Sequence, residues 1–148
     1  LVVYTGAIDE FFAYRLGRLE WRTVDLEWER PECADYQGTT VMNYADPEVP
    51  YTRIHEFKHY HPERPDTGKT LICREYSRLA AEGEEPYYPV DTRRNRELYL
   101  SYTALAAVEA PHVIFGGRLG GYKYLDMDKT VAKALECYEC EILPRMSR

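Results

Sequence analysis

Residues 116–128 constrain the fold of this chain more than any other segment, because they place four glycines, Arg118 and two tyrosines between two different periodic patterns. The preceding residues, 112–115, form a short apolar run typical of a strand. Apolar residues after the segment recur at helical spacing, at Val131, Leu135, Tyr138 and Ile142. We therefore predict an elbow from strand to helix, with Asp126 or Asp128 capping the helix. The free N–H groups at such a helix start suit an anion or an electron-rich ring edge.

The first part of the chain predicts an antiparallel sheet. Apolar and charged residues alternate over residues 24–29, which is typical of a strand with one face in water. Further strands are predicted at residues 39–44, 53–60 and 69–76, and the short connections between them favour antiparallel neighbours. A helix over residues 93–107, a strand around Val113 and the C-terminal helix follow. The expected class is α+β: a mostly antiparallel sheet followed by helix, strand and helix.

Length and charge narrow the classes of protein that the sequence fits. The 148 residues, 45% of them hydrophobic, are enough for one packed domain. No apolar run approaches the roughly 20 residues needed to cross a bilayer, so we expect no membrane partner and a cytoplasmic location. The net charge of −6 argues against a nucleic-acid surface. A single diphosphate needs only a few well-placed arginines, so it stays compatible with this charge.

Two groups of side chains raise the question of a metal site. The cysteines at positions 33, 73, 137 and 140 do not form a disulfide framework in a chain of this size, and we expect free thiols. The last two form a C-x-x-C within the predicted final helix, for which zinc or redox function is the less favoured interpretation. His55, His59 and His61 are predicted to fall on one face of a strand. Three histidines can form a zinc site, but solvated strand histidines are the favoured interpretation, so we predict no metal.

The elbow resembles the C-terminal flavin-binding signature of UDP-galactopyranose mutases, G-R-L-x-x-Y-x-Y-x-D-M, at every fixed position. Residues 4–9, 49–54 and 74–77, followed by 86–89, agree with the same family in order and approximate spacing. The resemblance implies an isomerase that interconverts UDP-galactopyranose and UDP-galactofuranose and requires reduced FAD. In the family the reaction passes through an adduct between flavin N5 and the sugar.

One part of the family pattern is missing from this sequence. Family members begin with a strand, a G-x-G-x-x-G turn and a helix that hold the FAD pyrophosphate, and no such spacing occurs here. We interpret residues 1–148 as a C-terminal mutase fragment whose partner is the N-terminal FAD-binding part of the same protein. Residues 7–90 would form the substrate region, and residues 1–6 and 91–148 would return to the FAD-binding domain. Alone, the chain is expected to be inactive, with exposed apolar surface that could form a homo-oligomer.

The resemblance assigns substrate and catalytic roles to individual residues. Arg53 matches an arginine that contacts the substrate diphosphate and is needed for activity, and Arg22 matches a second arginine near the nucleotide sugar. Glu75 matches a glutamate close to the sugar and flavin. Two tyrosines match residues that hydrogen-bond the diphosphate, Tyr88 and Tyr124. For each residue the alternative is an ordinary packing or surface role.

The same resemblance assigns contacts at the elbow. Arg118 matches the arginine beside the isoalloxazine, and Asp126 matches the acid near the uridyl-sugar site. Met127 would offer its backbone N–H to the flavin pyrimidine edge, and Gly117 and Tyr124 complete the expected FAD contacts. A helix start and an arginine both favour the negative charge of a reduced flavin.

Two other classes of function stay open from the sequence. One is a nucleotide-sugar or glycan binding module that binds without catalysis. The other is a structural oligomerisation domain of a flavoprotein, which would need exposed apolar surface.

Overall fold

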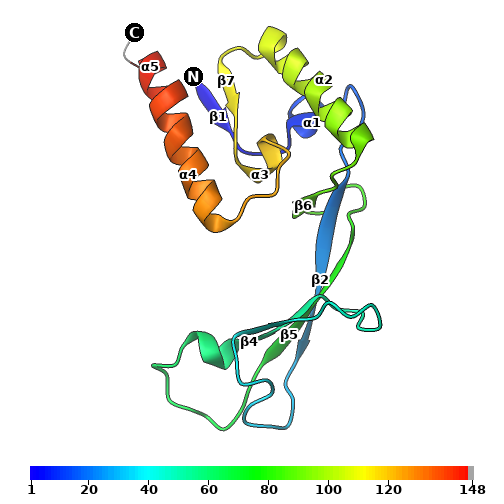
Figure 1. The fold of residues 1–148 in the computed structure, drawn as a ribbon, viewed down its shortest axis with the longest axis vertical. Helices are drawn as coiled ribbons and strands as arrows, with labels where there is room; N and C mark the ends of the chain where they lie inside the picture. Colours follow the sequence, from blue (N-terminus) through cyan, green and yellow to red (C-terminus); the bar gives the residue numbers. More distant parts are fainter. Residues whose placement is uncertain (147–148) are drawn as a thin grey trace. The chain divides into compact units, whose positions relative to one another are not determined.

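The computed structural model describes residues 1–146 and divides the chain into two compact units. Unit 1 comprises Leu1–Arg22 and the chain from Ala80 onward, and unit 2 comprises Thr23–Leu79. Figure 1 labels most of the helices and strands of both units.

A five-stranded sheet with antiparallel pairing confirms the predicted α+β class. Its strand order is β3-β4-β5-β2-β6. The strands are β2 (Trp21–Glu29), β3 (Val41–Asn43), β4 (Arg53–Glu56), β5 (Ile72–Leu79) and β6 (Tyr88–Pro89).

The core of unit 2 lies under β4 and β5, where Ile54 and Ile72 are fully buried. The alternation of apolar and charged residues over positions 24–29 predicts a strand, and β2 confirms it. However, Leu26 and Trp28, the residues expected to face a core, are 47% and 55% exposed. The charged residues of β2 bind partners on β5: ion pairs join Asp25 to Arg78 and Glu29 to Arg74, and the Tyr76 hydroxyl donates to Glu27 at 2.7 Å. In this part of the sheet, the side-chain contacts between β2 and β5 are therefore mainly polar pairs, and the apolar side chains of β2 are largely exposed.

Two strands of unit 2 begin or end at residues other than those predicted from the sequence. The strand predicted over residues 53–60 ends at Glu56, and Phe57–Tyr60 forms the 3₁₀ helix η1. In η1 the Phe57 ring stacks on Trp28 with ring centroids 5.2 Å apart. The prediction that three histidines share a strand face was therefore wrong, because only His55 lies on the strand. The strand predicted over 69–76 begins at Ile72 and continues to Leu79.

Unit 1 is built on a pair of parallel strands, β1 (Val2–Tyr4) and β7 (Val113–Phe115), packed with short and long helices. The long helix α2 (Arg93–Glu109) confirms the predicted helix and extends it by two residues. Thr92 caps it by accepting a hydrogen bond from the Asn95 N–H at 3.2 Å. The remaining helices are α1 (Ile8–Phe11), α3 (Gly117–Gly120), α4 (Met127–Cys137) and α5 (Leu143–Met146), with a π-helical segment η2 (Tyr138–Ile142) before α5.

The core of unit 1 lies between α1, α2 and the start of β2. Ile8 and Tyr102 are fully buried, and Trp21 packs edge-on against Tyr122 with ring centroids 4.9 Å apart. These residues come from segments far apart in the chain, so this core fixes where the elbow lies within unit 1.

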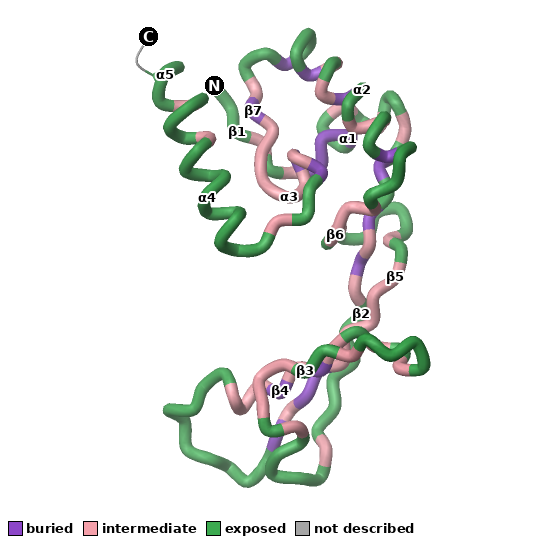
Figure 2. The backbone as a smooth tube through the Cα atoms, in the orientation of Figure 1, coloured by how far each residue is buried: buried purple, intermediate pink, exposed green. Residues whose placement is uncertain are grey.

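The C-terminal helix α4 is found as predicted, and it is exposed along its length (Figure 2). Apolar residues of α4, together with the residue at its C-cap, form a stripe with 48–87% exposure, which we call the α4 stripe: Met127, Val131, Leu135 and Tyr138. The prediction of a side-chain cap was wrong for Asp126, which occupies the N-cap position without a capping hydrogen bond. Its backbone carbonyl instead accepts from the Thr130 N–H at 2.8 Å and hydroxyl at 2.9 Å.

Two further sequence predictions concern cysteines and membrane spans. Within residues 1–146 all of the cysteines are free thiols, as predicted. Among the helices in that same range, none combines the length and the hydropathy that a transmembrane helix requires.

The core of unit 1 predicts a large effect for one hydroxyl group. The Tyr102 hydroxyl accepts from the Leu16 N–H at 3.0 Å and donates to the Gly17 carbonyl at 2.7 Å. In Tyr102→Phe both backbone groups lose their partner in a partly buried setting, so we expect the free energy of unfolding to fall by about 1–2 kcal/mol. Urea unfolding followed by circular dichroism measures this. The control is Tyr138→Phe on the exposed stripe, and equal stabilities of the two variants would contradict the prediction.

Candidate functional site

The predicted elbow is present, and two of its glycines are required by geometry. Gly117 has φ +72°, a conformation that side chains with a Cβ rarely adopt. At Gly120 a Cβ would lie 3.0 Å from the Tyr4 carbonyl oxygen and 3.3 Å from that of Gly6. The elbow backbone therefore packs directly against the end of β1, with the short helix α3 inside the turn.

Arg118 fixes the second half of the elbow. Its Nε and Nη2 donate to the Leu125 carbonyl at 3.0 and 2.7 Å, which ties α3 to the residue just before the α4 cap. The guanidinium also lies 4.8 Å from the Tyr124 ring centroid and 5.3 Å from that of Tyr88. Cation–π attraction to two rings keeps the positive charge at this surface.

Tyr88 and Tyr124 stack on one another with ring centroids 5.6 Å apart, although 36 positions separate them in the chain. A hydrogen bond to the Asp126 carboxylate, together with the charge of that group, raises the pKa of Tyr124. Arg22 on β2 lies opposite Tyr88 on β6 in the antiparallel register, so their side chains are cross-strand neighbours. These four residues and Arg118 form one surface of unit 1, which we call the elbow cluster.

Helix α4 begins at the edge of the elbow cluster. Met127 is its first residue, and the Met127 side chain is 87% exposed. The first N–H groups of a helix have no acceptor within the helix and carry partial positive charge. The start of α4 is thus suited to binding a negatively charged or electron-rich group through its backbone.

Tyr122 holds the elbow against the strands that carry Arg22 and Tyr88. It has φ +43°, and its hydroxyl donates to the Glu20 carbonyl at 2.7 Å and lies 3.0 Å from the Val90 carbonyl. Burial raises the pKa of Tyr122 to about 12, so the hydroxyl keeps its proton. Sequence reasoning assigned Tyr122 no role of its own, because a fixed tyrosine in a motif does not reveal whether it faces the ligand or the core.

A cavity of about 540 Å³ lies in unit 1 between the parallel strands and the C-terminal helices. Val3, Thr5 and Phe115 line it from the strand side, and Lys133 and Cys137 from the helix side. The sequence analysis did not predict this cavity. Residues of its helical wall recur at a spacing of three or four positions, as at Thr130, Lys133 and Cys137, which is a signal that could have indicated it.

The remaining predicted residues, Arg53 and Glu75, lie opposite each other on β4 and β5 of unit 2. Arg53 Nε is 3.3 Å from Glu75 Oε1, and His55 Nε2 is 3.7 Å from Glu75 Oε2. The Thr52 hydroxyl also lies 3.4 Å from Glu75 Oε1. The Glu75 side chain is only 12% exposed while that of Arg53 is 37% exposed, so the glutamate orients an arginine that solvent can reach.

Comparison with known proteins identifies the class to which this fold and these residues belong. A family model described as UDP-galactopyranose mutase matches residues 1–124, and the chain therefore belongs to this family of isomerases.

Three relatives show how much of a family member the chain represents. A probable UDP-galactopyranose mutase of Klebsiella pneumoniae is 45% identical over 91% of this chain and 34% of its own length. A dTDP-fucopyranose mutase of Escherichia coli is 40% identical over 95% of this chain and 37% of its own. A UDP-galactopyranose mutase of Mycoplasma pneumoniae is 36% identical, over 90% and 34%. The chain spans about a third of the length of these relatives.

The contact between Tyr124 and Asp126 generates a prediction about ionisation. Removing the carboxylate charge in Asp126→Asn takes away the groups that raise the pKa of Tyr124. We therefore expect its pKa to fall toward the ordinary value near 10. Tyrosine-ring ¹³C NMR across a pH titration measures it, with Tyr124→Phe assigning the signal. Asp128→Asn, on the first turn of α4, is the matched control, and a shift as large in that variant would contradict the prediction.

Proposed function

We propose that this chain is part of a flavin-dependent isomerase that interconverts UDP-galactopyranose and UDP-galactofuranose. The observation that carries the proposal is the elbow cluster, in which two arginines, two stacked tyrosines and a carboxylate meet beside the start of α4. Family membership supports the reaction class. An arginine and tyrosine surface suits a nucleoside diphosphate, because guanidinium and phenol groups donate hydrogen bonds to phosphate oxygens.

The residues at the elbow fit one edge of a reduced flavin. The start of α4 offers partial positive charge, Arg118 adds a full charge next to it, and Gly117 leaves that stretch of backbone without a side chain. The sequence contains no G-x-G-x-x-G for a pyrophosphate, so these residues would hold only part of FAD. When bound, reduced FAD would supply the covalent chemistry at the anomeric carbon of the sugar. In this proposal Met127 binds the flavin edge through its backbone N–H, and Tyr124 contacts both the flavin and the substrate.

We assign the substrate roles as follows. Arg22, Tyr88 and Tyr124 bind the diphosphate from unit 1, and Asp126 orients the Tyr124 hydroxyl toward it. In unit 2 we assign the catalytic role to Arg53, because a guanidinium can stabilise negative charge that develops in a transition state. Glu75 holds the Arg53 guanidinium in position through the ion pair.

A separate flavin-binding part of the same protein is the partner that we propose. The relatives are about three times as long as the region they share with this chain. Parallel strands are normally covered on both faces, yet Val2 and Val3 on β1 are 48% and 46% exposed. The α4 stripe is exposed as well, and both surfaces lie in unit 1 with the elbow (Figure 1). Together they provide apolar area for a second domain to cover.

We predict that this chain alone binds FAD weakly and has no mutase activity, because it contains no loop for the pyrophosphate. Titration of FAD with the purified chain, followed by flavin fluorescence, tests the binding. Submicromolar affinity would contradict the prediction. UDP binding without FAD, measured by calorimetry, would instead favour a nucleotide-sugar binding module.

We further predict that Arg53→Ala abolishes turnover in the complete enzyme that contains this chain, while the flavin absorption spectrum stays unchanged. The expected loss in kcat is at least about 100-fold, the size seen when one charge-stabilising donor is removed. Arg64→Ala, at a residue outside both site groups, is the control. A normal rate in Arg53→Ala would exclude Arg53 from the reaction. Parallel assays with dTDP-fucopyranose test the substrate suggested by the Escherichia coli relative.

A further inference from the structure

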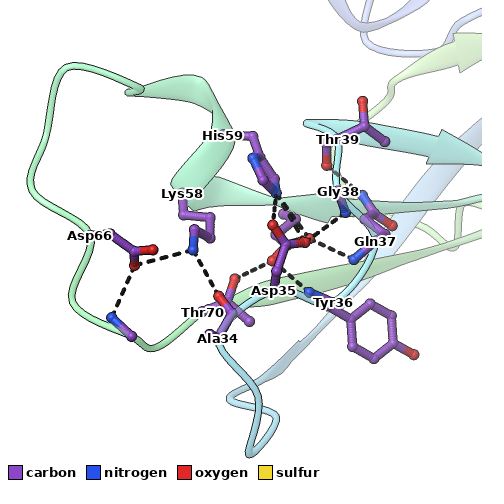
Figure 3. Close-up of polar contacts among 12 residues, drawn as sticks. Ala34, Asp35, Tyr36, Gln37, Gly38, Thr39, Lys58, His59, Asp66 and Thr70 are labelled. Carbon is purple, nitrogen blue, oxygen red and sulfur yellow. Dashed lines mark hydrogen bonds and ion pairs between the residues drawn. The ribbon is translucent and has the colours of Figure 1, made fainter.

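Unit 2 contains a group of potential metal ligands apart from the residues assigned above. Asp35 follows β2, Glu56 ends β4, and His59 lies in η1; we call these three residues the Asp-Glu-His cluster. Their ligand atoms all lie within 4.8 Å of one another. Figure 3 shows the His59 ring directed toward Asp35 and the turn that follows it. We propose that this cluster binds a divalent transition-metal ion of the Zn²⁺ type.

The distances within the cluster are those of long hydrogen bonds, as between His59 Nε2 and Asp35 Oδ1 at 3.4 Å, and they are also those between two ligands of one ion. His59 Nε2 is 3.3 Å from Asp35 Oδ2 and 3.4 Å from Glu56 Oε2. Charge-assisted hydrogen bonds between nitrogen and oxygen are shorter, about 2.7–2.9 Å. Zinc lies about 2.0–2.2 Å from nitrogen and oxygen ligands, and tetrahedral geometry then separates the ligands by about 3.3–3.6 Å. The imidazole is therefore at the distance that two ligands of one ion would have.

Hydrogen bonds to both carboxylate oxygens hold the Glu56 side chain in place. It is fully buried, and Oε1 accepts hydrogen bonds from the Tyr36 N–H at 2.9 Å and the Thr70 hydroxyl at 2.6 Å. Oε2 accepts from the Gln37 N–H at 2.8 Å and also faces His59. Burial raises the pKa of Glu56, but the hydrogen bonds outweigh it and leave the pKa below its usual range. These hydrogen bonds fix the direction in which the carboxylate oxygens face.

Asp35 is held by its own turn and opens the site to solvent. Its Oδ1 accepts a hydrogen bond from the Gly38 N–H at 2.7 Å, and Gly38 has φ +71°. This turn fixes the direction of the carboxylate. The Asp35 side chain is 47% exposed, so an ion can enter from solvent and water can complete its coordination.

The charge balance also favours a cation. Two carboxylates meet one imidazole, which is neutral unless it is protonated. The adjacent Lys58 ammonium binds the Ala34 carbonyl at 2.8 Å and Asp66 at 3.2 Å, away from the two carboxylates. Buried charges normally have a partner or coordinate a metal, and a divalent ion would neutralise both carboxylates. The ion would join the turn after β2 to β4 and η1, so its expected role is to stabilise unit 2.

Zinc titration of the chain, followed by calorimetry, tests this proposal. The background is the triple variant Cys33→Ser, Cys137→Ser, Cys140→Ser, because those thiols are at least partly exposed and thiolates are zinc ligands that would compete in the titration. We expect saturation at one ion per chain and a higher midpoint of thermal unfolding with Zn²⁺. In His59→Gln we expect affinity to fall at least about tenfold. The control His61→Gln changes a histidine that pairs with Glu63 outside the cluster, and its affinity should stay the same.

A second variant keeps the test valid if His59→Gln unfolds. Asp35→Asn keeps the shape of a partly exposed side chain, retains an acceptor for the Gly38 N–H, and removes one charged ligand. It should lose zinc affinity while its circular dichroism stays that of the parent. Failure of the parent to take up one Zn²⁺ ion saturably would overturn the proposal. Equal zinc affinity in the parent, Asp35→Asn and His61→Gln would overturn it as well.

Discussion

The buried hydroxyl of Tyr122 joins the three segments on which the site of unit 1 depends. It hydrogen-bonds the carbonyl before β2 and lies against the carbonyl just after β6, and the tyrosine itself belongs to the elbow. Because the pKa is raised to about 12, the proton that makes this contact stays in place at any physiological pH. Arg22, Tyr88 and Tyr124 come from these segments, so their meeting depends on a residue that touches no ligand in our proposal.

Unit 2 contains two glutamates with little exposed side chain, Glu56 and Glu75, and the charges of their carboxylates are compensated in two different ways. Glu75 is paired with Arg53 and lies near His55, so its charge is compensated by side chains of β4. Glu56 is compensated mainly by neutral donors, two backbone N–H groups and the Thr70 hydroxyl. Neutral donors stabilise the anion without neutralising it. This difference is why a cation is inferred next to Glu56 and not next to Glu75.

The elements that the sequence predicts well are those set by local pattern. Helix α2 and the glycine elbow follow from residue spacing within a dozen or so positions. At Gly117 the backbone also has a positive φ, which favours glycine. The end of β4 was not predictable in this way, because η1 brings Phe57 onto Trp28, a residue 29 positions earlier. The Asp-Glu-His cluster was missed for the same reason: Asp35 and His59 are 24 positions apart and meet only through the fold. The family resemblance supplied the residues of the elbow cluster but not their contacts.

In our proposal helix α4 would connect ligand binding to domain association, because its start lies at the elbow cluster and its apolar stripe is exposed. Burying a fully exposed large apolar side chain contributes about 1.5–3 kcal/mol. The four residues of the stripe are 48–87% exposed, so covering them gives roughly 4–8 kcal/mol before the cost of association. A covered stripe would hold α4 along its whole length and with it the first N–H groups at Met127. The geometry of those groups toward a flavin is then fixed by contacts with the covering domain. We therefore expect flavin affinity and domain association to strengthen each other, since each orders the same helix.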